Sequence, residues 1–99
     1  MSDFPSKAEF EAAVGSEFLM ELDGGATAPL LLKKCETKTD TSIQQCFSLV
    51  FVAPADAPPV QLMRRMRHAA LGEMTIFLVP VKLDSSGLYY EAVFNRLQA

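Results

Sequence analysis

Apolar and polar residues alternate along most of the chain, and this period of two is typical of β-strands with one buried side. In EFLMEL, the apolar residues Phe18, Met20 and Leu22 alternate with Glu17 and Glu21. The same pattern recurs along the chain between turn-forming segments such as DGGA, TDTS and DSSG. Together with the β-rich apolar runs, it predicts strands over residues 17–22, 28–38, 45–53, 73–83 and 88–95.

The strand predicted over 45–53 is apolar on both sides. One face carries the large apolar residues Phe47, Leu49 and Phe51. The other face is only slightly more polar and carries Cys46, Ser48, Val50 and Val52. A strand of this kind is central in its sheet or belongs to a closed barrel.

The last strand has one dry and one wet side. Its inward positions are Leu88, Tyr90, Ala92 and Phe94, and its outward positions are Tyr89, Glu91, Val93 and Asn95. Because neighbouring residues point to opposite sides of a strand, its polar groups cannot all line one pocket. In the preceding strand, Pro80 cannot donate a ladder hydrogen bond, so we expect a bulge or a sheet edge there.

A short helix precedes the strands. The sequence SKAE forms a capping box, in which Ser6 accepts from the amide of Glu9 and the Glu9 side chain reaches back to Ser6. Phe10, Ala13 and Val14 form the apolar stripe of this helix, which we expect to end at Gly15.

Residues 60–68, VQLMRRMRH, fit either a strand or a helix. On a strand, one face carries Val60, Leu62, Arg64, Met66 and His68, which places Arg64 among apolar residues. On a helix, Leu62, Met63 and Met66 form a stripe, and intrinsic propensity favours this alternative.

These elements predict a mainly β domain covering residues 1–99. Its fold class is a small antiparallel barrel or a strongly curled sheet of five to six strands, with one short N-terminal helix over one end. If residues 28–38 and 45–53 form a hairpin about Asp40 and Thr41, then Cys35 and Cys46 lie opposite each other. A disulfide would then be possible, but two reduced thiols are the expected state in a cytoplasmic protein.

Charge and composition narrow the classes of partner. The net charge of −3 argues against nucleic-acid binding, which needs many basic side chains. No apolar run approaches the roughly 20 residues that span a bilayer, and the N-terminus lacks the apolar core of a secretory signal. We therefore expect a cytoplasmic protein whose partner is neither nucleic acid nor membrane.

Few residues could carry chemistry. The chain has one histidine, His68, and neither it nor the two cysteines fit a metal motif, so we expect no metal and no cofactor. A lone histidine at a strand end is more often a hydrogen-bond partner of the following turn than a catalyst. The densest charged segment is the candidate interaction patch: Arg64, Arg65, Met66, Arg67 and His68.

The motifs FSLVF at 47–51, LG at 71–72, FLVPV at 77–81 and YEAVFN at 90–95 resemble a family of small bacterial proteins of unknown function. The resemblance covers nearly the whole chain and implies a compact β-rich domain, which favours the strand over the helix for residues 60–68. It also implies an association with phage-tail-like gene neighbourhoods. The chain departs from the family pattern at Leu62, where a glycine is expected, and at Arg64, where an aromatic residue is expected.

Three functional hypotheses follow, in order of preference. The first is a non-catalytic interaction or assembly module, which binds a protein partner or itself through surplus apolar strand surface. The second is a small-molecule-binding barrel with an aromatic interior lined by Phe47, Phe51, Phe77, Tyr90 and Phe94. The third, an enzyme that uses His68 with Arg64 and Glu91, is the least favoured.

Overall fold

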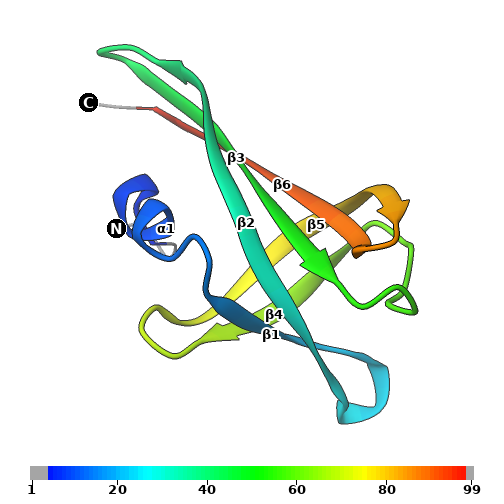
Figure 1. Cartoon of the computed structure of the whole chain (residues 1–99). Coiled ribbons are helices and arrows are strands. Elements are labelled where there is room, and N and C mark those ends of the chain that lie inside the picture. Colours follow the sequence, from blue (N-terminus) through cyan, green and yellow to red (C-terminus); the bar gives the residue numbers. More distant parts are fainter. Residues whose placement is uncertain (1–4, 98–99) are drawn as a thin grey trace.

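Six antiparallel strands form a closed ring in a computed structural model that describes residues 5–97. Around the ring the strands follow the order β1-β2-β3-β6-β5-β4 (Figure 1). The elements are the helix α1 (Lys7–Ala12) and the strands β1 (Glu17–Glu21), β2 (Thr27–Asp40), β3 (Gln44–Ala53), β4 (Leu62–His68), β5 (Gly72–Asp84) and β6 (Gly87–Leu97), with one 3-10 turn (Asp23–Gly25) after β1. The predicted fold class is therefore confirmed, and residues 62–68 form a strand rather than a helix.

The barrel interior is filled by the inward side of every strand, as the alternation predicts. Among its fully buried large side chains are Phe18, Met20, Leu30, Leu32, Phe47, Leu49, Phe51, Met66, Leu78 and Tyr90. One aromatic residue was placed wrongly: Phe77 points outward and is 48% exposed, because Met74, Ile76 and Leu78 form the buried side of β5. Four of the five predicted interior aromatic residues therefore belong to the core, since Phe94 packs against it and the other three are buried.

The helix α1 covers one end of the barrel. β5 pairs with β6 only from Gly87 to Glu91, so the far half of β6 continues with β2 and β3 as a three-stranded arm beyond the ring. α1 lies against this arm (Figure 1). The Phe10 ring stacks on Phe94 at 5.4 Å and tilts against Phe47 at 6.1 Å between centroids.

Local signals define the bounds of α1. The Ser6 hydroxyl accepts the amide of Glu9 at 3.1 Å, and the Glu9 carboxylate accepts the amide of Ser6 at 2.9 Å, which confirms the capping box. Gly15 follows the helix with φ of 90°, a conformation that favours glycine. Of the predicted apolar stripe, Phe10 and Ala13 are buried, whereas Val14 is 41% exposed because the helix ends before it.

The β2–β3 hairpin has a different register from the predicted one. β2 continues to Asp40, which pairs with Gln45, and bulges lie between Leu32 and Lys34 and again between Thr37 and Thr39. Cys35 therefore pairs with Leu49 and Cys46 with Thr39, so the cysteines do not face each other. Both are free thiols, and burial raises the pKa of Cys35.

Candidate functional site

β4 divides the predicted interaction patch between two sides of the barrel wall. Arg64, Met66 and His68 point inward and are buried, whereas Arg65 and Arg67 point outward and are exposed. The five residues therefore do not form one surface, since neighbours on a strand point to opposite faces.

Arg64 lies at the barrel end that contains the 3-10 turn. It is only 7% exposed, and its Nη1 lies 3.8 Å from Oδ1 of the solvent-exposed Asp23. Tyr90 lies near it and donates a hydrogen bond to the carbonyl oxygen of Pro58 in the loop before β4. Burial raises the pKa of Tyr90, and the positive charge of Arg64 partly opposes that effect. Arg64 is therefore buried at this end of the barrel, with Asp23 as its ion-pair partner, and does not lie in an open anion-binding site.

His68 lies at the opposite end of β4, and both of its ring nitrogens have partners. Nδ1 accepts the amides of Ala70 and Leu71 at 3.0 and 3.2 Å. Nε2 lies 2.8 Å from Oγ of Ser16, whose hydroxyl donates to the carbonyl oxygen of Ala13. This network assigns the histidine proton to Nε2. The ring therefore holds the turn after β4 and the segment before β1 together.

The three residues of the enzyme hypothesis do not converge. Arg64 and His68 are four residues apart on one strand, which separates their Cα atoms by roughly 13 Å. Glu91 lies on β6 beside Val79 of β5 and points outward. No single substrate atom can contact all three side chains.

The outer face of β4 and β5 carries apolar side chains in contact with solvent. Met63 and Phe77 are cross-strand partners, 54% and 48% exposed, and Val79 and Val81 continue the row along β5. We call Met63, Phe77, Val79 and Val81 the β5 stripe. Beside it, Arg65 lies 3.7 Å from Glu21 and 3.7 Å from Glu73, so charged groups border the stripe on one side.

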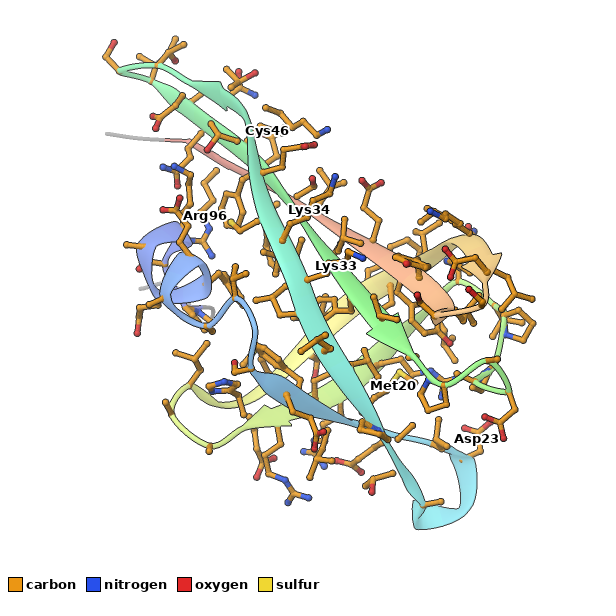
Figure 2. The ribbon with its side chains drawn as sticks, viewed as in Figure 1. Met20, Asp23, Lys33, Lys34, Cys46 and Arg96 are labelled. Atoms are coloured by element: carbon orange, nitrogen blue, oxygen red, sulfur yellow. The ribbon has the colours of Figure 1, made fainter. Side chains whose placement is uncertain are left out.

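A second feature on the outer face is basic. Lys33, Lys34, Val50, Val81, Lys82 and Tyr89 line an open depression of about 290 Å³, which we call the lysine groove. Its two β2 lysines are consecutive residues (Figure 2). The alternation along β6 predicts that Tyr89 lies on the outer face, and this is confirmed. It also predicts that the outer face is solvated, but the Tyr89 side chain is only 7% exposed. Nothing in the sequence signals that lysines from two strands cover it.

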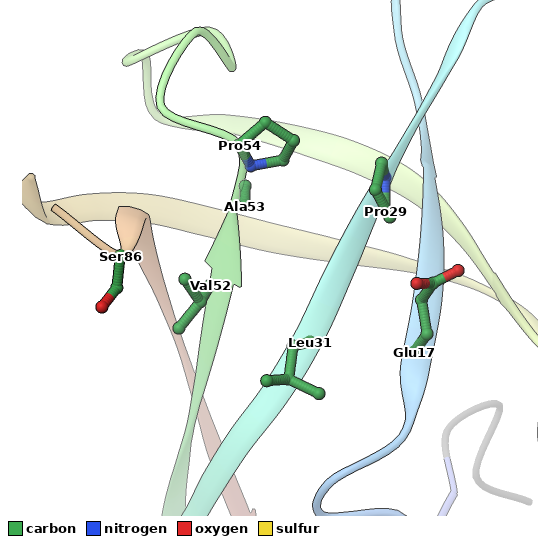
Figure 3. A pocket seen from close by; sticks show the side chains of 7 residues that line it. All are labelled: Glu17, Pro29, Leu31, Val52, Ala53, Pro54 and Ser86. Atoms are coloured by element: carbon green, nitrogen blue, oxygen red, sulfur yellow. The ribbon is translucent and has the colours of Figure 1, made fainter.

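A second depression, of about 300 Å³, crosses the outer face of β1, β2 and β3 (Figure 3). Its walls are Glu17, Pro29, Leu31, Val52, Ala53, Pro54 and Ser86. Glu17 is its one ionisable side chain, so it offers little that could orient a ligand.

Two further tests concern metals and membranes. Within residues 5–97, no group of three or more His, Cys, Asp or Glu side chains is arranged to hold a metal ion. No helix in this described part of the chain is long and apolar enough to span a bilayer.

Comparison with known proteins supplies the family. The sequence profile of DUF6916, a domain of unknown function, matches residues 5–94. No curated protein and no solved structure matches the chain significantly. Because the match covers the helix and the barrel up to the last residues of β6, the chain belongs to the DUF6916 family.

Proposed function

We propose that this chain is a non-catalytic protein-interaction module that binds its partner, or a second copy of itself, through the β5 stripe. The observation that carries the proposal is the cross-strand pair Met63 and Phe77, which expose about half of their surface on the barrel wall. Methionine, aromatic residues and arginine are enriched at protein interfaces. Arg65 at the border of the stripe completes this composition.

The shape of this surface suits a protein partner. The β5 stripe lies on the outer wall of the barrel, where exposed apolar side chains can pack against another protein. Burying Phe77 would remove further apolar area from water and so contribute to binding. Polar contacts of Arg65 at the rim would add orientation more than affinity.

The hydrogen bonds of His68 support the non-catalytic part of the proposal. In a serine–histidine pair that performs catalysis, the hydroxyl donates to the histidine, which then removes the proton. Here the Ser16 hydroxyl donates to Ala13 instead, and Nδ1 of His68 accepts two amides rather than donating to a carboxylate. The large side chains inside the barrel likewise give little support to ligand binding in its interior.

A bacterial, cytoplasmic setting is part of this proposal, as is the association with phage-tail-like gene neighbourhoods. The family resemblance supports the bacterial origin and the gene neighbourhood. The two free cysteines are consistent with a reducing compartment.

The test combines sedimentation velocity with affinity capture from lysate of the native host. Three baits are compared: the wild type, Phe77→Lys and the matched control Ile43→Lys, which alters a 69% exposed apolar residue in the β2–β3 turn. We expect self-association, or one captured protein, that persists with Ile43→Lys and is lost with Phe77→Lys. A monomer that captures nothing specific, or a partner retained by Phe77→Lys, would contradict the proposal.

A further inference from the structure

Two β-bulges bring lysines together on the outer face of the barrel. The bulge between Leu32 and Lys34 lets the consecutive Lys33 and Lys34 both be exposed instead of pointing to opposite sides. A second bulge, between Pro80 and Lys82, brings Lys82 opposite Tyr89 on β6. Bulges often re-aim side chains beside functional sites. Three of the five lysines of this acidic chain therefore meet at the lysine groove.

Tyr89 forms the floor of the groove. Nζ of Lys82 lies 4.8 Å and Nζ of Lys33 lies 5.4 Å from the centroid of its ring. The aromatic face attracts each ammonium group, which explains why two cations share one ring. Both ammonium groups therefore contact the same ring.

Two carboxylates pair with lysines of the groove, and each also has a partner outside it. Glu36 lies 2.8 Å from Lys38 but 3.5 Å from Lys34, so its stronger partner is outside the groove. The hydrogen bond from Lys38 is the largest of the effects that lower the pKa of Glu36.

Asp84, at the other end of the groove, has partners in the groove, Lys82 and Tyr89, and one outside it, the amide of Ser86. Its Oδ1 accepts the amide of Ser86 at 2.8 Å, and this bond is the main reason why its pKa is lowered. Lys82 approaches Asp84 only to 3.4 Å, in an exposed pair of the kind that contributes little. For Lys33 the contact within residues 5–97 is the Tyr89 ring, and no carboxylate pairs with it there.

We propose that the lysine groove binds a small organic acid. The carboxylate would lie among the ammonium groups of Lys33, Lys34 and Lys82, and its hydrocarbon part would pack on Val50 and Val81. The apolar walls favour an acid with an aliphatic or aromatic body over an inorganic anion, because the side chains of Val50 and Val81 cannot hydrogen-bond. No arginine within residues 5–97 lines the groove. The carboxylate would therefore be held by the point charges of the lysines and not by a bidentate guanidinium.

This site is separate from the function proposed above, because it concerns a small ligand rather than a protein. Val81 belongs to both the β5 stripe and the groove. Lys33 and Lys34 of β2 do not belong to the stripe, so substitutions on β2 test the groove alone.

The experiment is a chemical-shift titration of the ¹⁵N-labelled chain with three probes. Benzoate carries both the charge and the ring, benzamide is its neutral isostere, and inorganic phosphate carries charge without an apolar part. We expect saturable shifts with benzoate at Val50, Val81 and Tyr89, and at least about tenfold weaker binding of benzamide and phosphate. Added salt should weaken benzoate binding, because the contacts are solvent-exposed charges.

Matched variants locate the charge. Lys33→Met/Lys34→Met keeps the apolar stems and removes the two ammonium groups of β2, so we expect binding of benzoate about tenfold weaker. Lys7→Met removes a lysine that pairs with Glu11 and Asp40, none of which lines the groove, so affinity should stay within about twofold of the wild type. Absence of saturable benzoate shifts, equal binding of benzamide or phosphate, or unchanged binding by the double variant would each overturn the proposal.

Discussion

Phe10 is predicted to contribute most of the free energy that docks α1 on the barrel. Its side chain is fully buried, although it comes from a helix of six residues that could not be stable alone. Replacing a fully buried Phe with Ala removes apolar burial and leaves a cavity, at a typical cost of about 3–5 kcal/mol. We expect Phe10→Ala to fall near the lower end, about 3 kcal/mol, because a terminal helix can undock and limit the loss. That is a large part of the roughly 5–15 kcal/mol that stabilises a domain of this kind.

The assay is urea denaturation followed by far-UV circular dichroism, with Phe77→Ala as the matched control. Phe77 is half exposed and lies on the outer face, so its truncation should change the free energy of unfolding by less than about 1 kcal/mol. An unchanged m-value would show that both variants expose the same surface on unfolding. If Phe10→Ala were no more destabilising than Phe77→Ala, the docking of α1 through Phe10 would be refuted.

Three further predictions concern single positions. The hydroxyl of Ser48 is buried with no hydrogen-bond partner in the described structure, so Ser48→Ala should leave the urea midpoint unchanged or raise stability by up to about 1 kcal/mol; a clear loss would contradict this. In Gly87→Ala, the new Cβ would lie 2.0 Å from the carbonyl oxygen of Ala53, at a φ of 135°. The same assay should therefore show a free energy of unfolding lower by more than about 2 kcal/mol. A neutral result would exclude the observed turn geometry. Mild oxidation should give no intramolecular disulfide between Cys35 and Cys46 by mass spectrometry, and a crosslinked monomer would show a register other than the observed one.

The elements of this fold could be predicted from the sequence because their signals are local. The capping box at Ser6 and Glu9 and the period of two in β3 and β6 each specify a conformation within a few residues. Pro80 likewise predicts an irregularity in β5, and the bulge between Pro80 and Lys82 confirms it. Residues 60–68 required more than propensity, since packing in the barrel outweighs the helical preference of VQLMRRMRH.

The features that could not be predicted depend on pairing between distant segments. The β2–β3 turn lies later in the chain than predicted, because Asp40 pairs with Gln45, and with the bulge between Thr37 and Thr39 this separates Cys35 from Cys46. The bulge at Lys33 also has no proline or glycine to mark it. The same bulge makes two consecutive lysines face outward, which a strict alternation excludes. The hypothesis of an aromatic interior includes Phe77, but the parity of β5 is determined by the buried Met74, Ile76 and Leu78, which leaves Phe77 outside. The lysine groove therefore becomes visible only after β2, β3, β6 and β5 are assembled.

Site-specific photo-crosslinking tests the proposed interaction face most directly. p-Benzoylphenylalanine is placed at position 77, where it keeps an aromatic ring on the β5 stripe, or at position 43 as a control on the hairpin turn, and native host lysate is irradiated. We predict one discrete crosslinked protein, or a crosslinked dimer, from position 77 and none from position 43. Absence of any product from position 77, or the same products from both positions, would contradict the account.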